Sequence, residues 1–452
     1  MSGNRTTLAG ARTGRLLQGP ILPTLAALAA PGLVLAIMQT AVSVADTHYV
    51  GRLGTEALAG LALVFPLVML LQMTSAGAMG GGVSSAVARA LGAGRPHAAR
   101  ELVAHALVIA LCAGLLFTLL LLGLGRGLYA LLGGRGDTLR HALAYSDILF
   151  AGAVLVWLGN TLASVLRGSG NTLVPAAAWI GAGVLQIPLS GALTLGWGPF
   201  PRLGIAGAAM AYLAAAGVAS LAMGVYVWVG PLRPSRADWK LEWRVFREIL
   251  RVGLLSSVSA LQTVFTAVMV TGFVGAFGTA ALAGYGVGLR LELMQIPIVF
   301  AIGQSMVVLV GTNVGAGQGA RAKRIAWIGS AIAASFCALI GLTTAIHPAG
   351  WIGLFSQDPA VMETGSLYLR IAAPFFFFLG LGVALYFASQ GSGKVALPVL
   401  AGTARLVAVV AGGILAVKVF GSIAALFGAI ALGMLLLGGI TAWSVYRTSW
   451  SR

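Results

Sequence analysis

The sequence predicts an all-α polytopic membrane protein with 12 transmembrane helices, built as two parallel six-helix repeats. Three observations predict this fold. Of the 452 residues, 59% are hydrophobic and only 9% are charged, whereas about 25% are charged in soluble domains. Apolar runs long enough to cross a bilayer recur along the whole chain. A segment near residue 50 returns near residue 274, which indicates an internal repeat.

The predicted spans are apolar runs of about 20 residues or more. Helices are expected because lipid offers no partners to unpaired backbone groups, and because the runs lack the alternation of barrel strands. The 64 glycines suit close helix packing in a bundle. The spans cover approximately 25–49, 57–83, 101–124, 142–166, 174–196, 204–229, 246–272, 280–311, 324–346, 364–388, 395–418 and 424–446.

The repeat has an offset of 223 to 224 residues. Residues 50–60 match residues 274–284 at 8 of 11 positions, and shorter Gly-Ala-Gly and Gly-Ser-Gly motifs also recur. Six spans per repeat bring the second repeat into the bilayer from the same side as the first, so the repeats are parallel. We therefore predict an N-terminal lobe at 1–229, a Pro-rich and charged linker at 230–245, and a C-terminal lobe at 246–452.

The distribution of basic residues predicts the orientation. Of the 28 Lys and Arg, 19 lie on the side of the N-terminus, 6 on the opposite side and 3 within spans. The positive-inside rule then places both termini in the cytoplasm of a plasma or inner membrane protein. The net charge of +17 does not indicate nucleic-acid binding, because the charges lie in short connectors without a continuous basic surface.

No motif indicates an enzyme, a cofactor or a metal site. Gly391-Ser-Gly-Lys394 lacks the first Gly and the final Ser or Thr of a phosphate-binding loop. Cys112 and Cys337 lie singly in apolar runs, and no metal ligands gather around them. The five histidines are scattered through the sequence, so neither a metal nor a catalytic cluster is expected.

Asp46 is the first candidate for a functional residue. Ser43 and Gln39 precede it by three and seven residues, so the three polar groups lie along one helix face. Because ionisable groups inside membranes are costly and mark functional sites, this face should line a cavity in which Asp46 binds and releases a proton or a sodium ion. The alternative is a polar residue near the outer end of the helix.

Other polar and proline residues within the spans leave alternatives open. Arg290 and Glu292 are two residues apart and point to different faces, which allows either structural pairing or a role in substrate and cation handling. Asp147 and Arg370, equivalent in the repeat, could form an outer gate or be solvated helix ends. Pro31-Gly32 predicts either a bend used in transport or a static kink.

The sequence resembles the multidrug and toxic compound extrusion (MATE) family. The resemblance lies in Gln39-Thr40 to Asp46-Thr47 with the following glycines, in Leu91-Gly-Ala-Gly94, in Leu166 to Pro175 and in Gly288 to Glu292. It implies a V-shaped pair of lobes and alternating access. It also implies that Asp46 is the cation-coupling residue and that Pro31 matches a proline associated with helix bending.

The sequence also departs from the family pattern. The sodium-coupled branch has acidic residues where Gln262 and Leu379 align, and helix 5 carries Gln186 and Ser190 where the family has Asn or Asp. We therefore expect H⁺ coupling rather than Na⁺ coupling. Asn160 and Tyr386 are further candidates for the cavity, the latter because aromatic rings attract flat cations.

The expected function is secondary antiport, in which small organic cations or amphiphiles leave the cell in exchange for H⁺. The expected partners are the substrate, the coupling cation and the lipid bilayer, and a monomer is expected. A flippase for lipid-linked precursors is the alternative. A flippase would need a strongly cationic cavity, and only Arg290, Arg370 and Arg405 lie within spans.

Overall fold

The computed structural model describes residue 10 and residues 12–450, and this part of the chain is helical with no β-strand. It contains 11 helices that are long and apolar enough to cross a membrane, and one bent helix pair makes up to 12 spans. The predicted fold class is thereby confirmed. Arg5 and Arg452, which contributed to the predicted orientation, lie outside the described residues.

The first half of the described chain contains eight long or medium helices and a π-helical turn. Its elements are α2 (Ile21–Gly51), α3 (Thr55–Gln72), η1 (Met73–Met79), α4 (Gly80–Gly92), α5 (Pro96–Leu131), α6 (Gly136–Ala151), α7 (Ala153–Gly168), α8 (Leu173–Leu195) and α9 (Ile205–Val229). The π-turn η1 joins α3 and α4 into one span, which continues to residue 92 rather than ending near residue 83 as predicted.

The second half follows a short linker that contains the 3₁₀ turn η2 (Arg236–Trp239). Its elements are α10 (Trp243–Gly275), α11 (Thr279–Gly315), α12 (Gly319–Ile346), α13 (Pro348–Ile352), α14 (Pro359–Ala372), η3 (Ala373–Phe375), α15 (Phe376–Ser392), α16 (Ala396–Leu415), η4 (Ala416–Phe420) and α17 (Ile423–Arg447). The first span of this half therefore begins at Trp243, three residues before the predicted start.

The predicted fourth span, at 142–166, is not one continuous helix. It breaks at Gly152 into α6 and α7, whose axes differ by 52°. Glycine lowers helix stability at this position, and the side chain of Leu213 from α9 comes within 2.5 Å of where a Cβ of residue 152 would lie. A bulkier residue at 152 would displace Leu213, so the bend and the packing of α9 depend on the same glycine.

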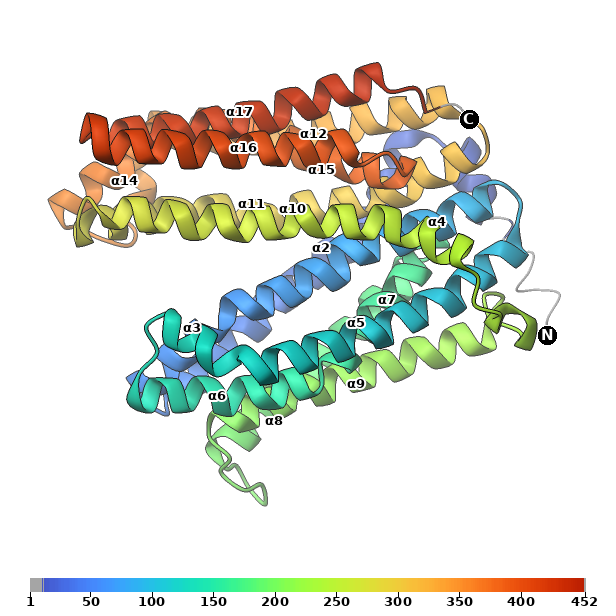
Figure 1. Cartoon of the computed structure of the whole chain (residues 1–452), viewed down its shortest axis with the longest axis horizontal. Helices are drawn as coiled ribbons and strands as arrows, with labels where there is room; N and C mark the ends of the chain where they lie inside the picture. The colour runs from blue at the N-terminus through green and yellow to red at the C-terminus, as the bar shows by residue number, and fades with distance from the viewer. Residues whose placement is uncertain (1–9, 11, 451–452) are drawn as a thin grey trace.

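The helices form two groups, each with its own hydrophobic core. One core draws mainly on α3 to α9, and the other on α10 to α17. Figure 1 shows that the groups meet near the chain termini and diverge toward the opposite end. Helix α4 makes the closest connection, because it packs against α10, α11 and α15 of the other group.

Polar contacts also join the two groups at the end that holds the termini. The Arg89 guanidinium donates to the Gly391 carbonyl oxygen at 3.2 Å and lies 3.6 Å from the Glu248 carboxylate. The Gln390 amide donates to the Gly77 carbonyl oxygen at 3.3 Å. Together with the packing of α4, these contacts close the molecule at this end.

Candidate functional site

Asp46 lies on α2 and is bound by two side chains of α8. The Ser190 hydroxyl donates to Oδ1 at 2.5 Å, and the Gln186 amide donates to Oδ2 at 2.9 Å. Gln186 and Ser190 are four residues apart and share one helix face, and both are buried. The sequence aligned these two residues with polar family positions, and the structure now places them directly against the candidate carboxylate.

The geometry at Asp46 leaves the carboxylate able to bind a cation. Each oxygen accepts one hydrogen bond, and an ionised carboxylate has about four lone-pair sites. Asp46 is half-buried, and Gln39 and Ser43 are exposed one to two turns earlier on α2. Access to the carboxylate and unused lone pairs are both needed for reversible binding of a proton or a metal cation.

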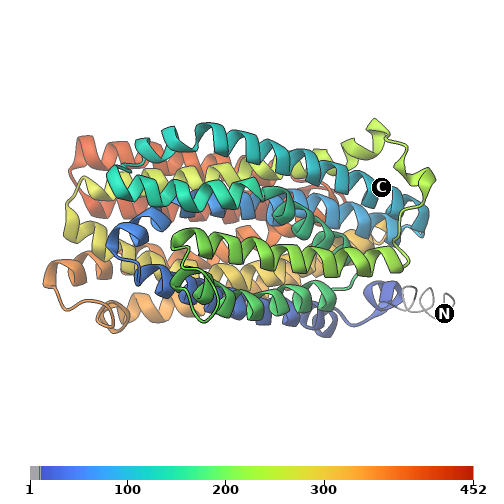
Figure 2. The ribbon, with the colours of Figure 1, turned by 90° about the horizontal axis from the view of Figure 1, so that it is seen from below.

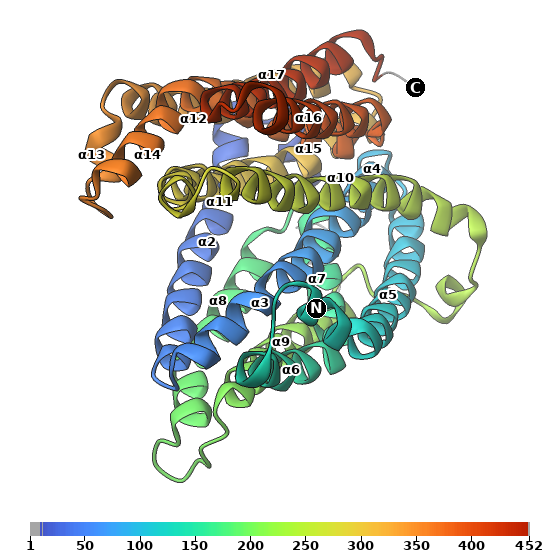
Figure 3. The ribbon, with the colours of Figure 1, turned by 60° about the vertical axis from the view of Figure 1, so that its left-hand side comes forward.

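Helix α2 contacts both halves of the molecule, and Pro31 lies between its two contact regions. Leu25 and Leu28 belong to the hydrophobic core of the second half, whereas Asp46 is bound to α8 of the first half. Figure 3 shows α2 passing between the two groups of helices, and it packs against both α11 and α8. Pro31 removes a backbone hydrogen bond at the point where these contacts change.

Asn160 belongs to a different cluster. Its amide donates to Gln72 at 3.0 Å and to the Ser75 hydroxyl at 2.8 Å, and Gln72 donates in turn to the Tyr212 hydroxyl at 2.5 Å. These bonds connect the end of α3 to α7 and α9, and the π-turn η1 to α7. The structure therefore gives Asn160 a role in fixing the bent span, and none of its side-chain bonds reaches Asp46.

Glu292 is buried in the second half and has partners from two other helices. The Tyr368 hydroxyl donates to Oε2 at 2.8 Å, and the Arg405 guanidinium lies 4.0 Å from Oε1. Arg290 is exposed and its guanidinium lies 5.4 Å from the centre of the Phe355 ring. The neighbouring charges thus have separate partners, as their spacing on the helix predicts.

Gln262 and Tyr386 also have partners within the second half. The Gln262 amide donates to the Thr403 hydroxyl at 2.7 Å, and the Tyr386 hydroxyl accepts from the Gln390 amide at 3.1 Å. The candidates from the sequence therefore form several clusters. Only Gln186 and Ser190 are brought into contact with Asp46.

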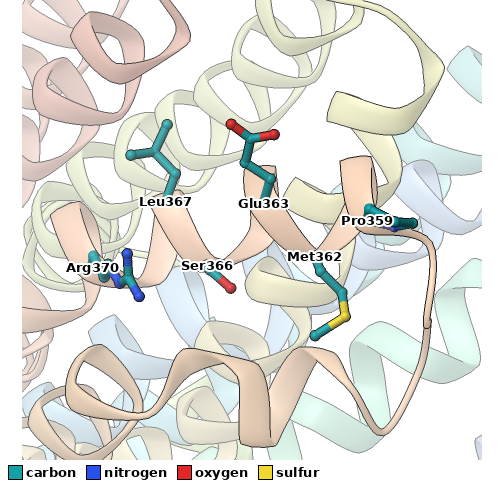
Figure 4. Close-up of a pocket in the computed structure, with 6 residues that line it drawn as sticks. All are labelled: Pro359, Met362, Glu363, Ser366, Leu367 and Arg370. Atoms are coloured by element: carbon teal, nitrogen blue, oxygen red, sulfur yellow. The ribbon is translucent and has the colours of Figure 1, made fainter.

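Asp147 and Arg370 form no ion pair with each other, so this structure holds no outer gate of that kind. Arg370 instead lines a surface hollow of about 450 Å³, shown in Figure 4. All six lining residues belong to α14. The hollow contains none of the other site candidates, so it is separate from the site at Asp46.

A cluster between α5 and the linker was missed by the sequence analysis. His97 Nδ1 lies 3.2 Å from Glu101, and His97 Nε2 lies 3.4 Å from Asp238. The expectation that no histidine gathers with other potential metal ligands is thus wrong, because these three side chains could hold a metal ion. The 137 or more residues that separate Asp238 from the other two gave no spacing signal.

The Asp238 carboxylate of this cluster already has several partners without a metal ion. Burial raises the pKa of Asp238, but hydrogen bonds from the Ser235 backbone and hydroxyl, with the charges of His97 and Arg100, lower it by more, so that its pKa lies below the ordinary value. The Arg100 guanidinium is 3.9 Å from the Asp238 carboxylate. We therefore interpret the cluster as an attachment of the linker to α5.

Comparison with known proteins places the chain among membrane transporters. The family model MatE matches residues 31–191 and 256–415. The FAD transporter of Shewanella oneidensis is 29% identical over 364 residues, which cover 79% of each chain. A probable multidrug resistance protein NorM of Thermotoga maritima is 26% identical over 387 residues, covering 82% of this chain and 80% of that protein.

The solved structures support the same conclusion at the level of the fold. An outward-facing multidrug resistance MATE family transporter superposes with a TM-score of 0.87 over 96% of each chain, at 23% identity. A MOP superfamily transporter from Pyrococcus furiosus has a TM-score of 0.86 and covers 96% of this chain and 98% of that one, also at 23% identity. Since the family model covers most of both repeats, the chain belongs to the MatE family, whose members are multidrug efflux transporters and not enzymes.

Proposed function

We propose that this chain is a secondary antiporter that exports small organic cations or amphiphiles in exchange for H⁺. The observation that carries the proposal is the Asp46 carboxylate on α2, bound by Gln186 and Ser190 of α8. Coupling requires one group that binds the ion and senses the conformation of the protein. The position of Asp46 supports both roles, because its carboxylate can accept a proton and its helix contacts both halves of the molecule.

The partners of Asp46 favour a proton over a sodium ion. Gln186 and Ser190 both donate hydrogen bonds to the carboxylate, and both are neutral, so neither adds the negative charge that would favour binding of a sodium ion. A serine hydroxyl can donate or accept, so Ser190 can donate to the ionised carboxylate and accept from the protonated one. No second carboxylate among the described residues hydrogen-bonds to this group.

The conformation and topology belong to the same proposal. With both termini in the cytoplasm of a plasma or inner membrane, the closed end of the molecule faces inward and the diverging end faces outward. Protonation of Asp46 from outside and its release inside would then accompany the opposite movement of the substrate. The chain is proposed to work as a monomer by this alternating access.

The arginines within the spans count against the flippase alternative. The Arg405 guanidinium lies beside Glu292, Arg290 lies over Phe355, and Arg370 lines the hollow on α14. A site for pyrophosphate-linked lipids would need cations gathered on a shared cavity. The three side chains are spread over different elements and partners, which favours a substrate without phosphate groups.

Transport by purified protein in liposomes would test the proposal. A pH gradient or a Na⁺ gradient would be imposed separately, with cationic, neutral and anionic dyes as substrates. We expect the pH gradient alone to drive cation uptake, and Asp46→Asn to abolish it while Asp147→Asn retains it. Equal transport by Asp46→Asn and the unmodified protein would refute the coupling role, and movement driven only by Na⁺ would refute the choice of ion.

A further inference from the structure

We propose that the linker between the two halves carries a binding site for the phosphate group of an anionic phospholipid. The site is a hollow of about 410 Å³ lined by six residues, Trp228, Arg233, Pro234, Ser235, Arg236 and Trp239. This hollow is distinct from the Asp46 site. Four observations support it: the rigidity of the linker, its charge, its aromatic residues and its depth relative to the membrane.

The linker has a defined conformation that does not depend on a ligand. Ser235 and Asp238 form a capping box around the 3₁₀ turn η2, and the carboxylate of Asp238 attaches this turn to His97 and Arg100 of α5. The His105 ring accepts a hydrogen bond at 3.0 Å from the backbone N–H of Glu242. Figure 2 shows η2 beside the start of α5, at the end of the bundle. Arg236 and Trp239 are therefore presented on a fixed turn.

The hollow carries positive charge that no carboxylate in its lining offsets. Arg233 and Arg236 are both exposed, and neither forms an ion pair among the described residues. The two acidic side chains of the linker have other partners, since Asp238 is 1% exposed and bonded to Ser235, and Glu242 lies 3.5 Å from Arg244. Two guanidinium groups on one hollow favour an anion with several oxygens, such as a phosphate.

Aromatic side chains define the second part of the site. The Arg233 guanidinium lies 5.2 Å from the centre of the Trp228 ring, which orients it over an aromatic face. Trp228 and Trp239 line the hollow, while Leu241 and Trp243 are exposed just beyond it, the latter at 72%. Exposed apolar residues at this density suit contact with lipid rather than with water.

The depth of the hollow decides between a lipid and a soluble phosphate compound. Trp228 lies in the last turn of α9, which ends at Val229, and the next candidate span begins at Trp243. The hollow is therefore at the end of two membrane-crossing helices, where Trp and basic residues meet lipid headgroups. An anionic phospholipid supplies both the phosphate for the arginines and acyl chains for the apolar residues.

Native mass spectrometry of the purified, delipidated chain with added phosphatidylglycerol or phosphatidylcholine would test this site. We expect preferential binding of phosphatidylglycerol, reduced roughly tenfold in Arg233→Ala/Arg236→Ala. Arg233→Gln alone should show an intermediate loss. The matched control is Arg324→Ala/Arg447→Ala, which removes the same charge from the same end, including an arginine 5.5 Å from the Trp443 ring.

Two results would overturn the proposal. An equal loss of phosphatidylglycerol in both double variants would mean that only total charge matters. Binding of inorganic phosphate as tight as binding of phosphatidylglycerol would show that the acyl chains contribute nothing. Both double variants must retain the elution volume and thermal stability of the unmodified protein. The single variant Arg233→Gln tests the loss of phosphatidylglycerol binding with a smaller change to the protein.

Discussion

Gly92 and Gly315 occupy equivalent positions of the two repeats, and each packs against the backbone of the opposite half. A Cβ on Gly92 would lie 2.0 Å from the Thr312 carbonyl oxygen, and a Cβ on Gly315 would lie 2.2 Å from the Arg89 carbonyl oxygen. Arg89 and Thr312 are themselves separated by the repeat offset of 223 residues. At the closed end of the molecule, Gly92 of the first repeat thus contacts the second repeat, and the equivalent Gly315 makes the equivalent contact with the first. Both contacts require the absence of a side chain at 92 and 315.

Gly92→Ala should open this end of the molecule. A methyl group cannot lie 2.0 Å from a carbonyl oxygen, so the substitution favours any conformation in which α4 and α11 separate. Spin labels at positions 95 and 320, in a background with Cys112 replaced by Ser, should report a longer distance. Gly181→Ala is the control, because no atom from another part of the structure lies within 4 Å of its Cβ position. An unchanged distance distribution in Gly92→Ala would contradict the interpretation.

Ser190→Ala should slow transport without unfolding the protein. The substitution removes one of the two hydrogen bonds to the Asp46 carboxylate, and bonds to charged groups are worth about 1.5–3 kcal/mol. We expect proton-driven transport in liposomes to fall about tenfold or more. Ser257→Ala is the control, since that hydroxyl bonds only to a carbonyl of its own helix. Similar transport rates for the two variants would show that the hydrogen bond from Ser190 to Asp46 is not needed for proton-coupled transport.

Pro31→Ala should impair transport while the protein stays folded. An N–H at residue 31 can restore the helical hydrogen bond to Ala27, which stiffens α2 where its contacts pass from one half to the other. We expect slower substrate efflux from cells and an unchanged or raised midpoint of thermal unfolding. Pro66→Ala in α3 serves for comparison. Normal efflux by Pro31→Ala would show that the bend at this proline is a static kink that transport does not use.

Glu292→Gln should lower the stability of the protein, whereas Arg290→Gln should not. Replacing the carboxylate leaves Arg405 without its counter-charge in a buried site, at a cost of about 3–5 kcal/mol. Arg290 is exposed, and its contact with Phe355 is worth about 0.5–1 kcal/mol. Thermal unfolding in detergent would compare the variants. Equal midpoints would exclude the buried ion pair as a source of stability.

Asp238→Asn should remove a pH-dependent part of the stability. Because the pKa of Asp238 is lower in the folded protein than in an unfolded chain, its stabilising effect is fully present above the ordinary carboxyl pKa of about 3.9. This effect disappears as the pH falls through the lower, folded pKa. The unfolding midpoints of the two proteins should therefore differ at neutral pH and converge in acid. Glu363→Gln provides the control for a surface carboxylate.

The spans and the repeat could be predicted from the sequence because both depend on local composition and on spacing along the chain. Apolar runs of about 20 residues predict membrane-spanning helices directly. The recurrence of the Gly-Ala-Gly motif at residue 315 indicated which positions of the two halves are equivalent. The break at Gly152 was missed, since it depends on Leu213 from another helix. Composition alone does not distinguish a bent span from a straight one.

Asp46 could be found in the sequence because a carboxylate inside an apolar run is conspicuous, and family alignment indicated Gln186 and Ser190. The partners of Glu292 could not be predicted, since Tyr368 and Arg405 come from helices with no fixed spacing to α11. The contact between His97 and Asp238 was missed for the same reason. Such pairs depend on how helices are arranged in space.

The attachment of the linker to α5 limits how the two halves can move. Asp238 and the backbone of Glu242 are both bonded to α5, so the linker is held against the first half up to the residue before α10 begins at Trp243. The start of α10 is therefore fixed in position relative to α5, rather than joined to it by a flexible segment. If the two halves rotate relative to each other, we expect the rotation to be centred on this attachment, so that the displacement is largest at the far end of the helices.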